Sequence, residues 1–566
     1  MNHPILTPLL CALALISLGC STDDTVTLYQ AQSIITMDED QPRAEAIAVK
    51  HGKIHAIGSL AAVRQQLQGL PVVEDQRFAD KVIMPGFIEP HLHPYLAGVL
   101  LPMEFITPHD WNMPGKKVEG VRGQAAYLQR LTQAVEQSDD WLWTWGYHHY
   151  FHGELNRDQL DLIAPDKPVV IWHRSFHEIY LNSAAIEALE LTEDEHPQID
   201  WAKGHFYENG LKQLVPHLMP KLTRPWRYLP ALTHARDIIH AGGITSVSDG
   251  AFGTINFDTE WTALRFSSWN RSSSPFRFSV LADGKGLGAA MGYESARDFI
   301  NQLSDKNTDQ VTFLPKQVKL FADGAAYSQL MQMSEGYLDG HHGEWLMTPE
   351  ELETAARVFW RDDYQLHIHV NGDLGLDRTL DIVERLKAEY PRDNHHTTIH
   401  HLAYARADQA QRMAELGVRV SANPYYVWAL ADKYSEVGLG PERAQNMVPL
   451  KSLVDAGVPF SFHSDFTMAP VEPLLLAWAA VTRLTADGKV ASPEQRIGLE
   501  RALRAITIDA AEQMQQSHLV GSLEIDKLAD FTILEQDPFD TPVEQLKDIP
   551  IWGTVLAGKP LPLETP

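Results

Sequence analysis

The stretch that decides the fold is Pro85-Gly86-Phe87-Ile88-Glu89-Pro90-His91-Leu92-His93, which directly follows the apolar run Val82–Met84. That run predicts a buried strand. Residues two positions apart in extended chain point the same way, so His91 and His93 can reach one cation together. Imidazole is the commonest protein ligand for ions of the zinc class. Because the chain has 26 histidines, one chance His-x-His pair is expected, and the other candidate ligands decide the interpretation.

Length and charge limit the classes of protein that the chain can represent. At 566 residues it is too long for one simple core, and its hydrophobic content of 44% is ordinary, so we expect two or more folded domains rather than disorder. The formal net charge is −27. Nucleic-acid binding needs a basic face, so a nucleic-acid partner is not expected and a small molecule is. The sequence leaves the oligomeric state undetermined.

Residues 1–20 predict an export signal. Residues 4–19 form a mostly apolar run that is too short for a comfortable membrane span. The Ser17–Cys20 segment resembles a bacterial lipoprotein cleavage box, although no Lys or Arg precedes the apolar run; the alternative is a plain signal peptide or a misplaced start. Cys11 would leave with the signal and Cys20 would carry lipid, so no pair remains for a disulfide. We therefore expect an exported lipoprotein of a bacterium, periplasmic or anchored to the outer membrane by lipid alone.

Both ends of the mature chain show short strand patterns. Residues 25–84 contain several such patterns separated by polar turns, and residues 506–566 contain a strand at Ala529–Leu534 and a closing hairpin around Gly553–Lys559. Strand-rich ends around a mixed middle predict a small β-sandwich domain built from both termini.

The middle of the chain, residues 85–505, alternates strand-like and helical patterns, which is typical of parallel βα units. The predicted strands are Val82–Phe87, Ile244–Ser248, Phe276–Leu281, Val318–Ala322, Leu366–Val370, Thr397–His401, Val418–Ala422 and Pro459–His463. Eight such units indicate an α/β fold of the (β/α)8 TIM-barrel type. The first connection is far longer than one βα unit needs, so we expect an inserted α/β subdomain at about residues 105–225, facing the substrate.

Candidate metal ligands fall at the carboxyl ends of the predicted strands. Five strands contribute them, and the set is His91, His93, Lys319, His369, His401 and Asp465. Active sites of TIM barrels gather at that face, whereas chance histidines would also be spread over helices and loops. The joint pattern therefore predicts a metal site.

This pattern resembles the amidohydrolase superfamily, in the branch that contains N-substituted formamide deformylases and, more distantly, D-aminoacylases. The resemblance runs from the Pro-Gly-Phe-Ile-x-x-His-x-His start to Ala529–Leu534. It implies two divalent metal ions, zinc first among the candidates. It assigns His91, His93 and Asp465 to one ion and His369 and His401 to the other. Lys319 would bridge both ions as an N-carboxylated lysine.

A lysine can serve as a ligand only under particular conditions. A protonated ammonium has no lone pair, but burial lowers the pKa and frees an amine that can capture carbon dioxide as a carbamate. The alternative is that Lys319 contacts substrate or pairs with Asp323.

The roles of three further histidines near the predicted ligands also stay open. His367 shares a strand face with His369, His400 stands where the family usually has Glu, and His463 could support Asp465 or simply pack in the core.

The substrate side of the predicted site is less specific. By resemblance, His177 in the insertion would contact the substrate carbonyl or its oxyanion; the alternative is a surface histidine beside a capped helix start. Glu208 and Tyr425 are further candidates for substrate binding. Trp141, Trp143 and Trp145 alternate onto one face, and we expect them in the core of the insertion rather than in a pocket.

The sequence therefore predicts a metal-dependent hydrolase that cleaves a non-peptide C–N bond, an amide first. In the predicted reaction a metal-bridging hydroxide attacks the carbonyl, and Asp465 shuttles the proton to the leaving nitrogen. A cyclic amidase or a deaminase on the same site is one alternative. A non-catalytic surface lipoprotein that retains the fold is the other.

Overall fold

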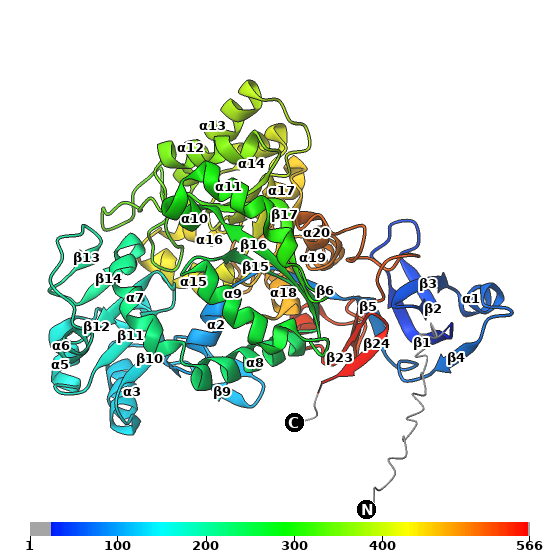
Figure 1. The fold of residues 1–566 in the computed structure, drawn as a ribbon, viewed down its shortest axis with the longest axis horizontal. Coiled ribbons are helices and arrows are strands. Elements are labelled where there is room, and N and C mark those ends of the chain that lie inside the picture. Colours follow the sequence, from blue (N-terminus) through cyan, green and yellow to red (C-terminus); the bar gives the residue numbers. More distant parts are fainter. Residues whose placement is uncertain (1–23, 564–566) are drawn as a thin grey trace, which may run out of the picture.

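A parallel eight-stranded sheet forms the centre of the structure, a computed structural model that describes residues 24–563 (Figure 1). In spatial order its strands are β21 (Phe460–Phe462), β20 (Arg419–Ala422), β19 (Thr398–His401), β18 (Gln365–Val370), β17 (Val311–Phe321), β16 (Arg277–Asp283), β15 (Ile244–Phe252) and β6 (Phe87–Leu92). The barrel closes between β6 and the segment that follows β21. Leu92 forms a bridge to Phe466 there, and the His93 amide donates to the Phe466 carbonyl at 2.9 Å. The predicted α/β barrel is confirmed, and the predicted signal peptide and Cys20 lie outside the described residues.

Helices cover the outside of this sheet. They are α8 (Pro225–Ala241), α9 (Phe257–Phe266), α10 (Gly284–Met291), α11 (Tyr293–Asn301), α12 (Pro349–Trp360), α13 (Asp373–Glu389), α14 (Ala407–Leu416), α15 (Tyr425–Glu436), α16 (Pro441–Gln445), α17 (Leu450–Ala456), α18 (Pro473–Thr482), α19 (Leu499–Ala505) and α20 (Ile508–Gln513). Local sequence explains several of their ends. A capping box formed by Thr348 and Glu351 starts α12, and left-handed Gly417 and Gly457 end α14 and α17.

The barrel begins later than the sequence predicts. The expected first strand, Val82–Phe87, is split at Gly86 into β5 (Val82–Pro85), which pairs with β22 (Phe531–Leu534), and β6, which is the first barrel strand. His91 therefore lies within a barrel strand rather than after one. Gly86 sits at the crossing between the two sheets, where a Cβ would lie 1.9 Å from Thr245 Oγ1. Only glycine lets the backbone approach that closely.

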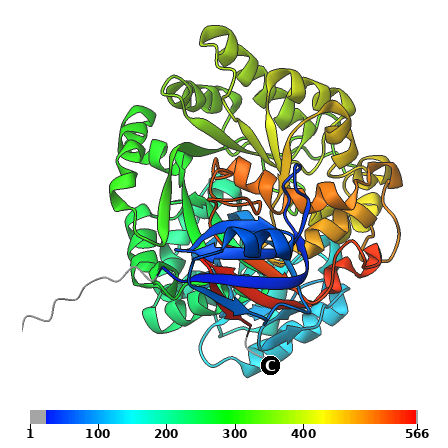
Figure 2. The same ribbon diagram turned by 90° about the vertical axis from the view of Figure 1, so that its right-hand side faces the viewer.

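A second sheet joins the two ends of the chain, and Figure 2 shows its strands from residues near both termini side by side. Its order is β24 (Lys559–Pro562), β23 (Ile551–Leu556), β22, β5, β1 (Val26–Ile35), β2 (Arg43–Lys50) and β3 (Lys53–Gly58), with β4 (Val72–Asp75) also paired to β1 and α1 (Leu60–Gln66) beside it. A bulge between Gln30 and Ile34 lets the first half of β1 pair with β4 and its second half with β5. The division of the chain into separate domains stays a prediction.

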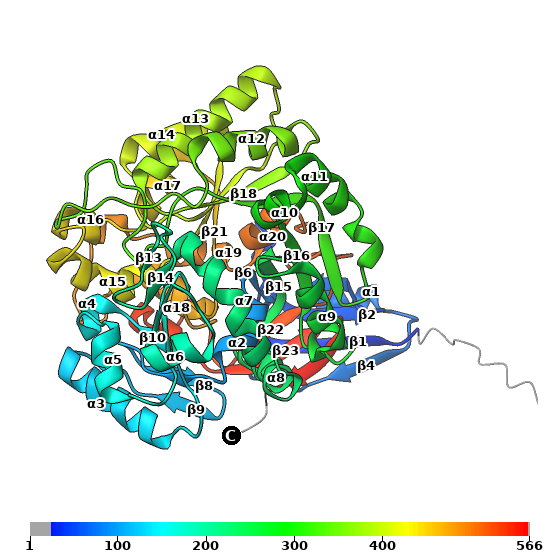
Figure 3. The same cartoon turned by 60° about the vertical axis from the view of Figure 1, so that its left-hand side comes forward.

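The long first connection carries its own sheet, which Figure 3 brings to the front with its helices. The sheet order is β13 (Ile199–Asp200), β14 (His205–Tyr207), β12 (Glu178–Leu181), β11 (Val169–His173), β10 (Leu142–Tyr147) and β7 (Glu104–Phe105). A hairpin of β8 (Trp111–Met113) and β9 (Lys116–Val118) accompanies the helices α2 (Pro94–Leu100), α3 (Gln124–Gln137), α4 (His149–His152), α5 (Arg157–Ile163), α6 (Ser183–Ala188) and α7 (Leu211–Leu222). Between residues 24 and 563, no helix has the length and apolar character that a membrane crossing needs.

Candidate metal centre and cavity

A cavity of about 940 Å³ lies where the barrel strands end and is partly walled by the insertion. The predicted site residues that line it are His91, His93, His177, Glu208, Lys319, His369, His401 and Asp465. The structure thus brings together all six predicted metal ligands, from segments that are hundreds of positions apart in the sequence.

One close group in the cavity lining consists of His91, His93 and Asp465, whose ligand atoms all lie within 4.8 Å of one another. Nε2 of His93 lies 3.1 Å from Asp465 Oδ1, and Nε2 of His91 lies 3.4 Å from the same oxygen. Burial alone would raise the pKa of Asp465, but the bond to His93 and the charges around it lower the pKa overall. Asp465 is therefore ionised at neutral pH.

The second predicted group surrounds Lys319. The rings of His369 and His401 lie 4.4 Å apart between centroids, and His401 Nδ1 is 3.7 Å from Asp465 Oδ2. Nζ of Lys319 and Nε2 of His401 are buried atoms without a hydrogen-bond partner among the described residues. Burial lowers the pKa of Lys319 to about 7. An amine and an imidazole nitrogen left without partners in a buried site, beside carboxylate and imidazole donors, form a donor set that fits divalent ions of the zinc class.

The structure does not pair Lys319 with Asp323, the alternative that the sequence left open. The Asp323 carboxylate instead accepts hydrogen bonds from the backbone amides of Gln332, Asn371 and Gly372, at 2.8–2.9 Å. Asp323 therefore holds the loops after two barrel strands together, and Lys319 is left free for another role.

A chain of hydrogen bonds behind the cavity sets the orientation of His91. The Gln317 amide nitrogen donates to the Met514 carbonyl at 3.2 Å, so its oxygen faces His367 and accepts from Nε2 at 2.9 Å. His400 Nε2 then donates to His367 Nδ1 at 2.8 Å, and His91 Nδ1 donates to His400 Nδ1 at 2.5 Å. This order leaves the lone pair of His91 on Nε2, the atom that faces the cavity. His367 and His400 are thus supports for a ligand.

We expect His400→Ala to weaken metal binding without removing any predicted ligand. His91 would lose the acceptor that fixes its tautomer, and loss of such a support typically costs about 10- to 100-fold in metal affinity. Zinc content measured in buffers of graded free zinc checks this. His395→Ala is the matched control, because His395 is also buried but bonds to Thr397 and the Leu416 carbonyl, away from the ligands. Equal zinc affinity in the two variants would contradict the relay.

Two further residues support the ligands, and of these only Glu89 was not already a candidate from the sequence. Glu89 is buried and accepts from the Ser464 amide at 3.0 Å and the His91 amide at 3.3 Å, so it ties the first barrel strand to the loop that carries Asp465. Burial raises the pKa of Glu89 to about 8. His463 bonds to Ser421 Oγ at 2.9 Å and lies 3.2 Å from His401 Nδ1. The signal for Glu89 was available, because it is an acid within the apolar strand that opens the barrel.

The insertion supplies one wall of the cavity. His177 Nδ1 bonds to Glu208 Oε2 at 2.7 Å, and the His177 ring lies 6.0 Å from that of His369. Burial acts to lower the pKa of His177, but the Glu208 carboxylate outweighs it and raises the pKa overall. His177 lines the cavity rather than the outer surface, and it presents a positively charged or donating ring to that cavity.

Tyr425 lies elsewhere than predicted. It is buried in the first turn of α15, outside the residues that line the cavity, and its hydroxyl accepts from Arg174 Nη2 at 3.0 Å. The bond to Arg174 holds the Tyr425 hydroxyl outside the cavity lining. Trp141, Trp143 and Trp145 also lie outside the cavity lining, in agreement with packing in the insertion.

Several polar residues of the cavity were missed. Lys285 and Asp283 lie at the end of β16, and Asp249 lies in β15 with Oδ1 3.9 Å from His93 Nδ1. Burial raises the pKa of both carboxyl groups. The rule that barrel sites collect at strand ends could have identified these three residues, but none of them belongs to a recognisable motif.

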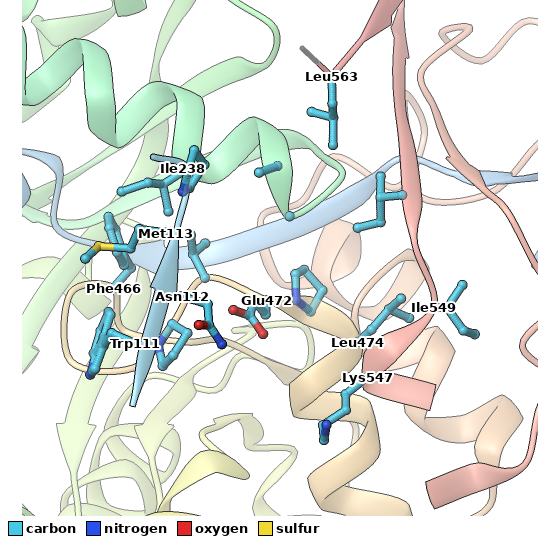
Figure 4. Close-up of a pocket in the computed structure, with 17 residues that line it drawn as sticks. Trp111, Asn112, Met113, Ile238, Phe466, Glu472, Leu474, Lys547, Ile549 and Leu563 are labelled. Carbon is cyan, nitrogen blue, oxygen red and sulfur yellow. The ribbon is translucent and has the colours of Figure 1, made fainter. Parts of the chain in front are cut away.

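A second cavity and a second histidine group lie outside the candidate metal centre. A smaller cavity of about 220 Å³ lies between the β8 hairpin and the C-terminal strands. Most of the side chains that line it are apolar, and Asn112, Glu472 and Lys547 are among the polar ones (Figure 4). His148, His149 and His173 form a separate close group. There Nδ1 of His148 and of His173 each accepts a backbone amide, at 3.3 and 3.1 Å. Those bonds place the ring protons on Nε2, and we assign no ion to this group.

Comparison with known proteins identifies a family and several similar proteins. A family model described as "Amidohydrolase family" matches residues 79–562. An N-substituted formamide deformylase from Arthrobacter pascens is 24% identical, over 93% of this chain and 96% of its own length. The Arabidopsis thaliana protein LONG AFTER FAR-RED 3 is 25% identical, over 94% of this chain and 90% of its own.

Solved structures show the same fold. The crystal structure of an uncharacterized metal-dependent hydrolase from Pyrococcus horikoshii OT3 superposes with a TM-score of 0.69 at 22% identity, over 92% of this chain and 99% of that one. A metal-dependent hydrolase from Pyrococcus furiosus gives a TM-score of 0.66 at 21% identity, over 91% and 100%.

Proposed function

Because the chain belongs to the amidohydrolase family and is a metal-dependent hydrolase of carbon–nitrogen bonds, we propose that it cleaves the non-peptide amide bond of a small molecule. The observation that carries the proposal is the meeting, in one cavity, of four imidazoles, an ionised carboxylate and a buried, unpartnered lysine amine. The imidazoles and the lysine could hold the metal ions that amide hydrolysis would use, and the carboxylate could transfer a proton.

We propose that His91, His93 and Asp465 hold one divalent ion and that His369 and His401 hold a second, with zinc the first candidate. When bound, such ions supply Lewis acidity to a carbonyl group and to water. Lys319 would join them as an N-carboxylated lysine. Its neutral amine attacks carbon dioxide, an N–C bond forms, and the released proton leaves to solvent. The low pKa of Lys319 supports this step, because it makes the neutral amine accessible near pH 7.

Asp465 would carry a proton from the attacking water to the leaving nitrogen. Its carboxylate is ionised and faces the cavity, so it can accept a proton from the attacking water and pass it to the leaving nitrogen. The products are then an amine and a carboxylate, and Asp465 returns to its ionised form. His177, held by Glu208, would donate a hydrogen bond to the developing oxyanion.

A substrate panel tests the proposal. The relative named N-substituted formamide deformylase makes N-substituted formamides the first compounds to assay, followed by cyclic amides and amino-substituted heterocycles. Release of an amine together with a carboxylate is the expected result. Ammonia as the product would favour a deaminase. A fully metal-loaded protein that turns over no compound of the panel would favour the non-catalytic lipoprotein.

We further propose that the chain is exported and lipidated at Cys20, on the strength of the sequence alone, since this segment lies outside the described residues. Labelled palmitate should enter the protein in a bacterial host and should not enter Cys20→Ser. Equal labelling of both would contradict lipidation at this cysteine.

A further inference from the structure

The segment that follows β21 contributes side chains to two different cavities. Asp465 and Met468 line the cavity at the barrel strand ends, which we call the barrel cavity. Phe466 and residues 470–474 line the smaller cavity beside the β8 hairpin, which we call the hairpin cavity. The Phe466 carbonyl also accepts from the amide of His93, a predicted metal ligand, at 2.9 Å. A molecule in the hairpin cavity would therefore contact the same short segment that carries Asp465.

The hairpin cavity has room for one small ring and is mainly apolar. Its walls come from the β8 hairpin, the end of α8, the segment after β21 and the C-terminal strands. Trp111 and Phe466, two of its aromatic residues, are buried. An engineered apolar cavity of about 150 Å³ is large enough to bind benzene. The volume of about 220 Å³ found here therefore accommodates a substituted benzene ring or an alkyl group of similar size.

Glu472 gives this apolar cavity an acidic group without a partner. Figure 4 shows it between Trp111 and Ile549. Glu472 stands at the N-cap of α18, but its side chain makes no capping bond, and among residues 24–563 its carboxylate has no hydrogen bond or ion pair. Burial raises the pKa of Glu472 to about 7, and the charge of Lys547 opposes that rise. A carboxylate in such a place gains strongly from a cationic hydrogen-bond donor.

The other charges around the hairpin cavity are matched. Glu472 and Lys547 are the charged residues of its lining. Nζ of Lys547 donates to Asp548 at 2.6 Å and lies 5.6 Å from the centre of the Trp478 ring. Lys547 thus has its own counter-ion, and the unmatched charge is the negative one of ionised Glu472. This balance favours a cationic ligand over an anionic one.

We propose that the hairpin cavity binds a small apolar amine in its protonated form, with the ammonium group on Glu472 and the apolar part against the surrounding side chains. The ammonium supplies the partner that Glu472 lacks, and burial of the apolar part removes hydrophobic surface from water. Because the segment that carries Asp465 forms part of the wall, the bound amine would also restrain that segment. The site does not depend on the proposed hydrolysis, so its test stands apart from that function.

Binding of three matched probes to zinc-loaded protein tests the charge requirement. The probes are 4-bromobenzylamine, which is protonated at neutral pH, neutral 4-bromobenzyl alcohol and anionic 4-bromobenzoate. Calorimetry should find the amine bound most tightly. Glu472→Gln keeps the shape of the side chain and should weaken binding of the amine by about 10- to 100-fold, the range of one hydrogen bond to a charged group. Binding of the alcohol should stay within a few-fold.

Glu500→Gln is the matched control, because Glu500 is an exposed acid in the first turn of α19 and lines neither cavity. Its variant should bind the amine as wild type does. Ala241→Phe fills the hairpin cavity while leaving Glu472 in place, and it should abolish binding of both the amine and the alcohol. Thermal unfolding of each variant shows whether the fold is retained. Equal affinity for the amine in wild type and Glu472→Gln would overturn the proposal.

Anomalous diffraction at the bromine edge locates the bound amine without any variant. We expect a bromine peak in the hairpin cavity. The barrel cavity is the competing position, because acidic side chains also line it. A peak found there alone would overturn the assignment.

Hydrogen exchange tests the restraint on the segment that carries Asp465. With the amine at about 100 times its Kd, exchange through openings that break the site should slow by up to about 100-fold. The expected slowing covers the amides of residues 466–476 and leaves those of α13, which lies outside the lining, unchanged. Exchange in residues 466–476 that is equally fast with and without bound amine would contradict the restraint.

Discussion

Replacing Asp465 with Asn is expected to lower kcat by about 10²- to 10⁴-fold, the range that general acid–base catalysis contributes. Asparagine keeps an oxygen that can face His91 and His93 but cannot accept a proton at neutral pH. The bond to His93 helps to keep Asp465 ionised and able to accept a proton. Asparagine has nearly the same shape, so we attribute the expected loss of turnover to lost proton transfer. Turnover of the best amide substrate, measured with metal content in the same sample, checks the prediction.

Asp283→Asn serves as the matched control for Asp465→Asn. Asp283 is also a buried carboxyl group in the cavity lining, but its oxygens cap α10. We expect its variant to keep kcat within a few-fold of wild type. An Asp465→Asn enzyme with full metal content and wild-type turnover would remove Asp465 from the role of proton carrier.

Lys319→Ala is expected to lose most of the metal bound in the barrel and, with it, activity by about 10³-fold or more. The Lewis acidity of a bound ion contributes several kcal/mol to such reactions, and each 1.36 kcal/mol is tenfold in rate. The fold should survive, because Nζ of Lys319 makes no hydrogen bond that the substitution would break. Metal analysis and thermal unfolding of the same preparation separate the two effects.

N-carboxylation of Lys319 leads to a second prediction. Metal-free protein reloaded with zinc in buffer depleted of carbon dioxide should regain less activity than protein reloaded with bicarbonate. Lys285→Ala is the control for loss of a cavity lysine, and its metal content should equal that of wild type. A Lys319→Ala protein that holds as much metal as wild type would exclude the lysine as a ligand.

The sequence predicted the barrel because its strands are apolar runs separated by helical patterns, and both signals are local. It misplaced the first strand, since Val82–Phe87 shows no clear break in its sequence pattern and its division at Gly86 depends on Thr245 packing against that glycine. That contact joins residues 159 positions apart, and nothing near Gly86 in the sequence reveals it.

The same distinction between local and distant signals applies to the site. The six predicted ligands follow a rule about strand ends, so the sequence could identify them. The residues that orient the ligands could not be identified from a rule about strand ends. Gln317, His367 and His400 become a relay only because neighbouring strands place them on diagonal positions, each two residues out of register with the next. Tyr425 was misplaced because its hydroxyl binds Arg174, a partner 251 positions away that nothing near Tyr425 in the sequence reveals.

Anomalous diffraction from crystals of zinc-loaded protein tests the central claim most directly. The account predicts zinc peaks inside the barrel cavity, about 2.0–2.3 Å from ligand atoms of His91 and His93 for one ion and of His369 and His401 for the other, with density for a carbamate on Lys319. A fully loaded crystal whose zinc peaks all lie away from these side chains would contradict it.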